Sequence, residues 1–359
     1  MDQQVGLKTA ALNLERAAGE DATILSEFLP VTYKSDAMIF RVTPLPKNWK
    51  GAMAGAHEIR AAMADPSRFD GILWATWAAK LTPDLVRCVP AFLRMDMTPV
   101  QMRSMGEQYG YSGLRARLFL GWKERSTRRL YEAARHHFPW SEYVARSLRD
   151  DYGVPSEKIT VVSPGTDTGM FRPDPARFAR ADRETIRLLF VGGDFRRKGG
   201  DLLIDWMAKQ GRGVAGKRVE LHLVTRDKVP EAAHMENVIV HHGVSNNSPE
   251  LIELYRQSDL FVLPTRADCY SLVAMEAMAC GVPVLITDIG GISDIVSDGE
   301  TGFLLRRDDA RLMGERLEFL IGNESERRRM SFAARERACS QFDSRICSQR
   351  MLRIMKAAI

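Results

Sequence analysis

The chain is poor in cysteine and has no long apolar run. Its 359 residues include five cysteines, an odd number, and none of them forms a C-x-x-C pair. This pattern argues against a disulfide framework and against a metal site built on cysteine pairs. No stretch approaches the roughly 18 apolar residues of a membrane-spanning helix, and the N-terminal MDQQVGLKTA lacks the apolar segment of a signal peptide. We therefore expect a cytoplasmic protein with reduced thiols.

Two common nucleotide-binding patterns are also missing. The chain has no G-x-x-x-x-G-K-[ST] loop, and no G-x-G-x-x-G motif follows its first strand with an acidic residue about 20 positions on, which argues against a P-loop ATPase and an NAD-dependent dehydrogenase. Of the Asp-x-Asp spacing that holds divalent ions, only a single carboxylate is present, Asp96 in RMDMTP, so we expect no bound metal. The net charge of +5 is small for this length, and we expect no nucleic-acid partner.

The second half of the chain alternates short apolar runs with helical patterns. A chain of this length is too long for one comfortable core, so two domains are expected. Strands are predicted over residues 186–191, 219–225, 238–243, 259–264 and 282–287, with helices over 200–210, 248–257 and 271–280. Such alternation predicts an α/β fold with a parallel sheet covered on both faces.

The first half is less regular. Strands are predicted over residues 69–76, 89–96 and 158–163, a buried strand begins at His136 and His137, and a helix over 141–152 ends before Gly153. The Pro- and Gly-rich stretch 163–175 predicts an interdomain linker. We place the domains at 1–170 and 171–342, with a C-terminal helix over 343–359 that packs back toward the first domain.

The most informative stretch is residues 263–287, LPTRADCYSLVAMEAMACGVPVLIT, which has the pattern strand, loop, helix, turn, strand. Asp268 lies in the loop and Glu276 lies eight positions later, in the helix. Backbone N–H groups of Ser271 and Leu272 would be free at the helix N-terminus, where a diphosphate is favoured. Glu276 could accept hydrogen bonds from two ribose hydroxyls. The competing interpretation is that Asp268 caps the helix and Glu276 is a solvated surface charge.

A second candidate element is residues 190–200, FVGGDFRRKGG. Glycines allow the backbone to approach a phosphate closely, and Arg196, Arg197 and Lys198 can neutralise its charge. The alternative is an ordinary solvated basic turn. A third element is residues 288–304, DIGGISDIVSDGETGFL, in which Gly290 and Gly291 precede a short helix over 292–296. By itself this third element could be a simple connection.

The order of these three segments resembles the donor domain of family-4 retaining glycosyltransferases, which have the GT-B fold of two facing Rossmann-like domains with an interdomain cleft. The helix motif matches the family's E-x7-E signature, with Asp268 in place of the first glutamate. The upstream SEYVARSLRDDYGVPSEKITVVSPGTDTGMFRP is also similar to the family. The resemblance implies transfer of a sugar from a nucleotide diphosphate sugar to an acceptor hydroxyl, with attack on the same face and the leaving phosphate receiving the acceptor proton.

Site residues follow from this resemblance. Lys198 would bind the donor diphosphate, Arg197 would supply further positive charge, Asp268 would face the sugar, and Glu276 would hold the ribose. The remaining donor-side positions are Gly192, Gly193, Tyr270, Ser271 and Leu272. On the acceptor side, Gly6 would match the glycine loop near the leaving phosphate. Asp96 would contact the acceptor or sugar, or alternatively cap a strand end.

Three departures from the family pattern matter. Gly193 stands where the family usually has arginine, Asp268 is one methylene shorter than glutamate, and the chain begins where the family would already have finished its first strand. They motivate an alternative, a catalytically weak or inactive nucleotide-sugar-binding protein of the same fold. A nucleotide-sugar epimerase would need its own acid and base pair, and the sequence offers no convincing one.

The expected partners are a nucleotide sugar donor and a glycan, lipid-linked or small-molecule acceptor, as in polysaccharide biosynthesis, and no cofactor is expected. A cluster of seven arginine and lysine residues with only two glutamates spans residues 115–135, beside apolar side chains. It could lie peripherally on an anionic membrane surface. The alternative is a solvated helix with its apolar stripe in the core.

Overall fold

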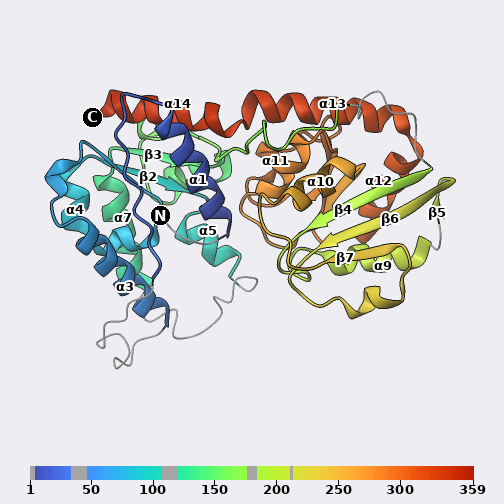
Figure 1. Ribbon diagram of the computed structural model, residues 1–359. Coiled ribbons are helices and arrows are strands. Elements are labelled where there is room, and N and C mark those ends of the chain that lie inside the picture. Colours follow the sequence, from blue (N-terminus) through green and yellow to red (C-terminus); the bar gives the residue numbers. More distant parts are fainter. Residues whose placement is uncertain (1–4, 34–46, 107–119, 176–183, 211–212) are drawn as a thin grey trace. The chain divides into compact units, whose positions relative to one another are not determined.

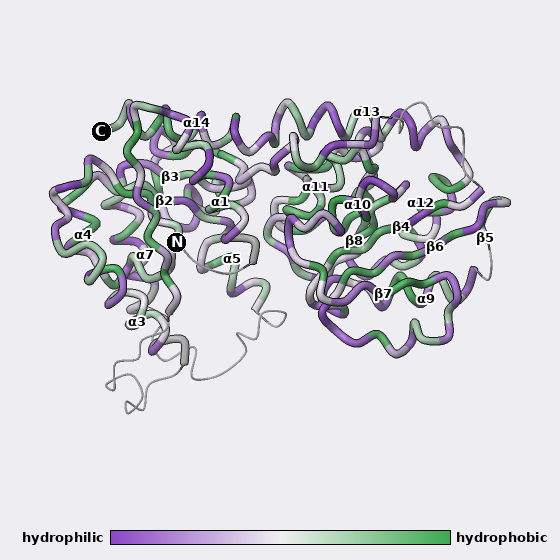
Figure 2. The backbone as a smooth tube through the Cα atoms, viewed as in Figure 1, coloured by the Kyte–Doolittle hydropathy of each residue, from purple (hydrophilic) through white to green (hydrophobic). Residues whose placement is uncertain are grey.

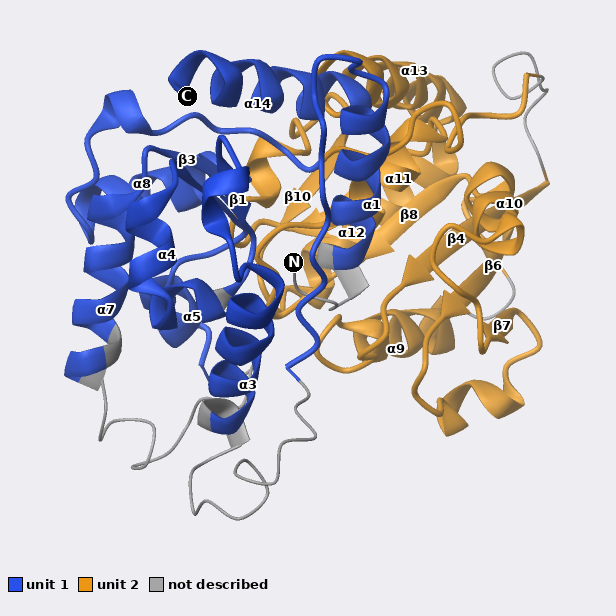
Figure 3. Cartoon of the chain, turned by 60° about the vertical axis from the view of Figure 1, so that its left-hand side comes forward, with its two compact units in different colours: residues 1–164, 345–359 blue, residues 165–344 orange. Residues whose placement is uncertain are grey.

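The computed structural model describes residues 5–33, 47–106, 120–175, 184–210 and 213–359 (Figure 1). The chain divides into two compact units (Figure 3). Unit 1 comprises Met1–Pro164 together with Arg345–Ile359, and unit 2 comprises Gly165–Ser344. The sequence placed the corresponding boundaries at residues 170 and 342, and it assigned the C-terminal helix to the first of the two parts.

Unit 2 contains a mostly parallel sheet. Its strands are β4 (Thr185–Val191), β5 (Gly213–Val214), β6 (Lys217–Val224), β7 (Val238–His241), β8 (Leu260–Leu263), β9 (Val284–Thr287) and β10 (Gly302–Leu305). The order is β10-β9-β8-β4-β6, with β7 parallel to β6 and the short β5 antiparallel to it. Each apolar run predicted as a strand in this half of the chain forms one, which confirms the predicted parallel α/β sheet.

Helices cover both faces of this sheet. They are α9 (Gly200–Gln210), α10 (Pro249–Gln257), α11 (Leu272–Ala279), α12 (Ala310–Gly322) and α13 (Glu324–Gln341), with single 3-10 turns at Pro230–His234 and Ile292–Asp294. Right-handed crossovers join parallel strands. The chain moves across the sheet from β4 toward β6 through α9, and it moves in the opposite direction to β8 and β9 through α10 and α11. The two directions place α9 on one face and α10 and α11 on the other. Figure 1 accordingly shows α9 on one side of the sheet and α10 and α11 on the other.

The central strands of unit 2 are mostly apolar because both of their faces are largely buried. All residues of β8 and β9 are buried, and hydrophobic colour follows β4 and β8 through the middle of the unit in Figure 2. A strand packed on both faces loses the alternation of apolar and polar residues that a half-exposed strand shows. This double burial makes the strand ends, rather than their faces, the places where the unit presents functional groups.

Unit 1 contains a three-stranded parallel sheet of β1 (Ile72–Trp74), β2 (Ala91–Met95) and β3 (His136–Pro139), in that order. Side chains of successive strand residues point to opposite faces, and β2 shows the consequence. Ala91 and Leu93 belong to one apolar cluster, whereas Phe92 belongs to a second with Phe138. The predicted strand at His136 is confirmed.

The helices of unit 1 supply the other side of each cluster. They are α1 (Val5–Gly19), α3 (Lys47–Ala62), α4 (Pro83–Cys88), α5 (Pro99–Ser104), α7 (Leu120–Ala133), α8 (Glu142–Asp150) and α14 (Ser344–Ala358), with 3-10 turns η1 (Pro66–Arg68), η2 (Trp77–Leu81) and η3 (Ser156–Lys158). From α14, Met351 is buried against Phe92 and Phe138. Arg135 donates to the carbonyl of Ala358 over 2.8 Å, which fixes the end of α14 on this unit.

The predicted strand over residues 158–163 is wrong. Lys158 ends the 3-10 turn η3, and only a single bridge joins Ile159 to His137. Thr160 and Val162 donate to the carbonyls of His137 and Pro139 over 3.0 and 2.9 Å. Proline has no N–H with which to return a hydrogen bond, so the ladder beside β3 stops after one bridge.

Gly199 offers a test of the packing beneath the loop that carries Arg196, Arg197 and Lys198, called the basic loop below. Its φ is +77°, and a Cβ at this position would lie 2.0 Å from the carbonyl oxygen of Pro264. Gly199→Ala should lower the free energy of unfolding by at least about 2 kcal/mol, because the left-handed conformation alone costs roughly 1 kcal/mol and the contact displaces the loop. Gly243→Ala is the matched control, with φ of +77° and no atom within 4 Å. Equal losses in urea unfolding would contradict this account.

Candidate functional site

Two of the three predicted motifs of unit 2 lie at the carboxyl ends of β4 and β8. These strands are parallel neighbours, with Leu188 paired to Leu260. From β4 the chain moves to β6 and β7 on one side, and it returns through α10 to β8 on the other. In open α/β sheets, ligands bind outside the carboxyl ends of the strands at the point where the strand order reverses. The loop after β4 and the loop after β8 meet at that point.

The loop after β4 is packed closely against its surroundings. A Cβ on Gly192 would lie 3.0 Å from the side chain of Lys198, and one on Gly200 would lie 2.2 Å from the ring of Phe195. Gly192 donates to the carbonyl of Val224 over 2.9 Å, which ties the loop to the end of β6. Glycine is needed at these positions because a side chain would fill the space that the neighbouring groups occupy.

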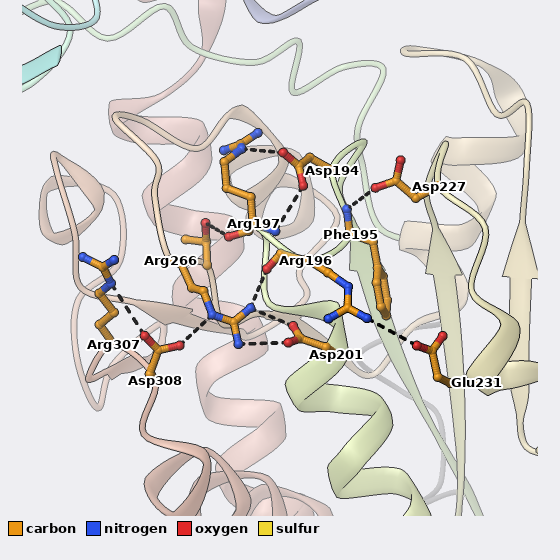
Figure 4. A network of polar contacts seen from close by, with 11 residues as sticks. Asp194, Phe195, Arg196, Arg197, Asp201, Asp227, Glu231, Arg266, Arg307 and Asp308 are labelled. Atoms are coloured by element: carbon orange, nitrogen blue, oxygen red, sulfur yellow. Dashed lines mark hydrogen bonds and ion pairs between the residues drawn. The ribbon is translucent and has the colours of Figure 1, made fainter. Parts of the chain in front are cut away.

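The two arginines of this loop have different surroundings (Figure 4). Arg196 points to Glu231, 3.6 Å away, and the Arg196 side chain is 78% exposed. Arg197 pairs with Asp194 at 3.0 Å and donates to the carbonyl of Ala267 over 2.7 Å. Arg196 is thus solvated, as the alternative of an ordinary basic turn expects, whereas Arg197 is held inside the loop.

Lys198 forms an ion pair with Asp268. Only 13% of the Lys198 side chain and 9% of the Asp268 side chain are exposed. The structure thus brings together two residues that are 70 positions apart in the chain and that the sequence assigned to one site. A second tie joins the same two loops, because the Arg266 N–H donates to the carbonyl of Arg197 over 2.8 Å.

The start of α11 has unused hydrogen-bonding groups. Ser271 is the N-cap residue but makes no side-chain capping bond, and its hydroxyl is buried without a hydrogen-bond partner among the described residues. The backbone N–H groups of Ser271 and Leu272 likewise have no acceptor within the described part of the chain. Free donors at a helix N-terminus favour an anion. Tyr270, just before them, is buried.

The third predicted segment borders the same place. Gly291 donates to the carbonyl of Cys269 over 2.9 Å. Gly290 has a φ of +63°, and a Cβ on it would lie 2.5 Å from the carbonyl oxygen of Asp268. The segment is therefore packed against the loop that carries Asp268, and it is more than a connection between two elements.

Glu276 lies inside unit 2, with 5% of its surface exposed. Its carboxylate accepts a hydrogen bond from the Tyr255 hydroxyl of α10 over 2.9 Å. Burial raises the pKa of Glu276 from 4.5 to about 7, and the Tyr255 hydrogen bond lowers it in part. Glu276 is not a solvated surface charge, and Asp268 pairs with Lys198 instead of capping the helix, so the competing interpretation of this motif is wrong.

The raised pKa of Glu276 predicts how stability depends on pH. The folded protein holds a proton at Glu276 up to about pH 7, whereas the unfolded chain releases it near 4.5. The stability that this group contributes is therefore complete below pH 4.5 and is lost as the pH rises to about 7. Glu276→Gln cannot ionise, so its advantage in free energy of unfolding over the wild type should grow by up to roughly 3 kcal/mol between pH 4.5 and 8. Urea titrations of both proteins at pH 4.5 and pH 8 measure this change. A difference in free energy of unfolding that is the same at both pH values would contradict the prediction.

Three features that the sequence did not single out support this site. Tyr255 is the partner of Glu276, and Arg266 pairs with Asp201 of α9 and with Asp308, at 2.7 Å in each case (Figure 4). Arg226, in the loop after β6, lies against Gly193. Tyr255 and Arg226 lie outside the predicted motifs, and Arg266 lies within residues 263–287 without a role predicted for it. Parallel strands end at the same edge of a sheet. This expectation alone could have pointed to Arg226, because it follows the end of β6 at residue 224.

The two acceptor-side predictions fall in unit 1. Gly6 lies in the first turn of α1 and not in a loop after a strand. Asp96 follows β2 directly and lines a cavity of about 50 Å³ together with residues that include Trp74, Thr76 and Tyr131. The structure shows a position at a strand end for Asp96, and the roles of both residues stay predictions.

The described residues contain neither a metal-binding cluster nor a membrane-spanning helix. No group of three or more histidine, cysteine, aspartate or glutamate side chains in that part of the chain is arranged to hold a metal ion. Among the helices that the structure describes, none combines the length and the apolar character needed to cross a membrane.

Comparison with solved structures defines the class of the fold. Sucrose-phosphate synthase from Thermosynechococcus elongatus superposes with a TM-score of 0.72 at 17% identity, covering 98% of this chain and 92% of that one. The Anabaena protein HepE in complex with UDP also gives a TM-score of 0.72, at 16% identity and covering 99% of this chain and 98% of that one. The protein has the GT-B fold, as expected from the sequence.

Sequence comparison identifies the family. The model named Glycosyl transferases group 1 matches residues 174–337, and the model named Glycosyltransferase Family 4 matches residues 39–169. D-inositol 3-phosphate glycosyltransferase of Nocardia farcinica is 32% identical over 206 residues, which are 53% of this chain and 46% of that protein. The chain belongs to the family-4 glycosyltransferases. It spans about half the length of the curated relatives it matches.

Proposed function

We propose that this protein is a retaining glycosyltransferase that moves a sugar from a nucleotide diphosphate sugar to an acceptor hydroxyl. The observation that supports this most is the meeting of Lys198, Asp268 and the unused donors of Ser271 at the reversal of strand order in unit 2. A cation and free helix donors together favour a diphosphate. In this proposal Asp268, beside them, accepts a hydrogen bond from a hydroxyl of the donor sugar.

The proposed reaction breaks the bond between the sugar anomeric carbon and the terminal phosphate oxygen. The acceptor oxygen forms its new bond to that carbon on the same face, and the acceptor proton passes to an oxygen of the departing diphosphate. Negative charge accumulates on the diphosphate, so Lys198 and the N–H groups at the start of α11 are the expected source of rate. Arg197, held by Asp194, orders the loop and adds positive charge. We propose that these protein groups, without a metal, supply the neutralising charge.

Glu276 and Tyr255 have a different role in this proposal. A carboxylate can accept two hydroxyl hydrogen bonds from the ribose, and such charge-assisted bonds are stronger than neutral ones. Because burial raises the pKa of Glu276 to about 7, a large fraction of the molecules carry a proton on Glu276 at neutral pH before a nucleotide binds. The Tyr255 hydroxyl already favours the ionised form, and ribose hydroxyls would favour it further. Nucleotide binding should therefore release protons near pH 7.

A donor screen tests the proposal. A bound ligand raises apparent stability by mass action, so nucleotide sugars with uridine, guanosine or adenosine can be compared by their shift in melting temperature. The Anabaena relative was solved with UDP, UDP-glucose and glucose, which makes UDP-glucose the first donor to try. Stabilising donors are then assayed for transfer to inositol phosphate, lipid-linked and glycan acceptors. A protein that none of these donors stabilises would refute the proposed function.

The second candidate is a nucleotide-sugar-binding protein with weak or no catalysis. Two observations favour it, because Gly193 provides no charged side chain and Asp268 is engaged by Lys198. This candidate predicts donor binding by calorimetry without turnover or with slow hydrolysis only. Transfer to any acceptor at rates well above donor hydrolysis would exclude it.

We also propose that unit 1 contacts anionic lipid. A groove of about 450 Å³ between η2, α4 and α7 is lined by four cations and by no acidic side chain of the described chain. The cations are Lys80, Arg87, Arg125 and Arg129, over an apolar floor that includes Val86 and Leu130. Trp122 at its edge is 44% exposed.

The buried side of α7 packs in the core through Tyr131, so the helix has both an apolar stripe and a basic face. The part of the predicted cluster before residue 120 lies outside the described residues.

Vesicle sedimentation tests this contact. The wild type should bind vesicles rich in phosphatidylglycerol, and the charge reversal Arg125→Glu/Arg129→Glu should abolish most of that binding, since each basic side chain contributes roughly 1 kcal/mol near an anionic surface. Arg307→Glu/Arg311→Glu reverses two exposed charges of unit 2 and serves as control. Equal binding by wild type and groove variant would refute the contact.

A further inference from the structure

We propose that Arg226, which lies outside every predicted motif, binds the donor diphosphate over the Gly192–Gly193 turn. Its guanidinium takes the place of the charge that Gly193 cannot provide. This inference rests on the proposed function, and it adds to the site a residue that comes from the loop after β6.

The register of the sheet places Arg226 beside the glycine turn. β4 and β6 are parallel, and their last residues, Val191 and Val224, are paired. Gly192–Gly193 and Arg226 therefore follow neighbouring strands at the same edge. A Cβ on Gly193 would lie 2.7 Å from Nη2 and 2.8 Å from Nε of Arg226. The guanidinium thus lies directly against Gly193.

The loop that carries Arg226 is fixed to the basic loop. Asp227 accepts a hydrogen bond from the backbone N–H of Phe195 over 2.7 Å (Figure 4). The Gly192 N–H donates to the carbonyl of Val224 over 2.9 Å, and the Asp227 N–H donates to the Thr225 hydroxyl over 3.3 Å. These bonds lie on both sides of Arg226 in the sequence. The backbone of Arg226 is therefore held in place without using its side chain.

The guanidinium of Arg226 has no hydrogen bond or ion pair with any described residue. Arg197 pairs with Asp194 and Arg196 points to Glu231, so both loop arginines have carboxylate neighbours. Arg226 is exposed and keeps all five of its N–H donors available. An arginine held over a glycine turn with its donors free suits the bidentate recognition of phosphate oxygens.

Two cations thus lie against two consecutive glycines. The Lys198 side chain packs on Gly192, and the Arg226 guanidinium packs on Gly193. Two positive groups beside a bare backbone match a ligand with two adjacent phosphates better than one with a single phosphate. We infer that Arg226 discriminates a nucleoside diphosphate from a nucleoside monophosphate.

The glycine is part of this arrangement. Gly193 has no left-handed φ, so alanine can adopt its backbone conformation. The atoms within 4 Å that an added methyl would meet most closely belong to the Arg226 side chain. Gly193→Ala should therefore move the guanidinium while it keeps the charge and the fold. Its effect on binding should depend on the presence of Arg226.

A double-mutant cycle with UDP and UMP, measured by calorimetry, tests the assignment. Arg226→Ala should weaken UDP binding roughly tenfold to a hundredfold, as expected for a charge-assisted hydrogen bond, and should change UMP binding much less. Gly193→Ala should weaken UDP binding in the wild type and have no further effect in the Arg226→Ala background. Lys228→Ala removes an exposed positive charge from the same loop and should leave UDP binding within about twofold of the wild type, because exposed charges are screened. Urea unfolding of each variant verifies the fold.

The outcomes separate the two proposals. A wild-type protein that binds UDP together with an Arg226→Ala variant of unchanged affinity would overturn the role of Arg226 alone. Equal losses for UDP and UMP, or additive effects of Gly193→Ala and Arg226→Ala, would overturn it as well. A wild type that binds none of UDP, GDP and ADP would overturn the proposed function, and the role of Arg226 with it.

Discussion

Lys198→Ala is expected to reduce the turnover of sugar transfer by roughly a hundredfold to a thousandfold. The loss has this size because a preorganised positive group beside a leaving diphosphate acts most strongly when charge develops on it. Steady-state assays with the donor found by the screen measure the effect as kcat. The Michaelis constant for the donor should change less than kcat, since the ground-state diphosphate retains Arg226 and the helix donors.

The ion pair of Lys198 with Asp268 complicates this variant and supplies its control. Removal of the lysine leaves the Asp268 carboxylate, whose side chain is 9% exposed, without its cation, which destabilises the fold. Asp268→Asn leaves the lysine charged and unpaired, and the double variant Lys198→Ala/Asp268→Asn removes both charges. If the catalytic loss came from the uncompensated carboxylate alone, the double variant would recover turnover. We expect no such recovery, and full recovery would refute the role of Lys198.

Glu276→Ala is expected to weaken binding of the nucleotide sugar by roughly tenfold to a hundredfold. In the wild type the carboxylate would accept hydrogen bonds from two ribose hydroxyls. A hydrogen bond to a charged group contributes about 1.5–3 kcal/mol. Calorimetry with the nucleoside diphosphate measures the loss directly. Because Glu276 is buried in α11 and accepts a hydrogen bond from Tyr255, Glu276→Gln is the better variant for keeping the packing while it removes the negative charge.

The matched control for Glu276 is a change in the ligand. A dideoxynucleotide lacks both ribose hydroxyls, so Glu276→Ala should not weaken its binding further. If the variant loses the same factor for both ligands, Glu276 acts on the fold or on the phosphates and not on the ribose. Tyr255→Phe removes the hydrogen bond that favours the ionised carboxylate, so it should shift the onset of tight nucleotide binding to higher pH.

Most of unit 2 was predictable because its signals are local. The strands of unit 2 are apolar runs between turn residues, and each one forms where the pattern placed it, within a few residues. Helix α9 has the predicted bounds, and α10 starts beside the predicted N-terminal serine, whose hydroxyl accepts the Leu251 N–H over 3.2 Å. The order of the motifs along the chain, and with it the family, was also available from sequence.

Unit 1 was harder to predict for a physical reason. At least two helical segments separate successive strands of unit 1, so the alternation of one apolar run with one helix that marks the strands of unit 2 is absent there. The error at residues 158–163 came from Pro139, a residue on the neighbouring strand that cannot donate the next hydrogen bond. Nothing within residues 158–163 themselves contains that information.

By itself, the sequence determined the parallel α/β architecture of unit 2, the order of its predicted phosphate-binding motifs and the choice of Lys198, Asp268 and Glu276 as candidate functional side chains. The tertiary structure decided which charges are paired and which are free. Arg197 is held by Asp194, Glu276 is buried against Tyr255, and the guanidinium of Arg226 lies over Gly193. The reason is that strand order and register set these contacts, and both depend on residues far apart in the chain.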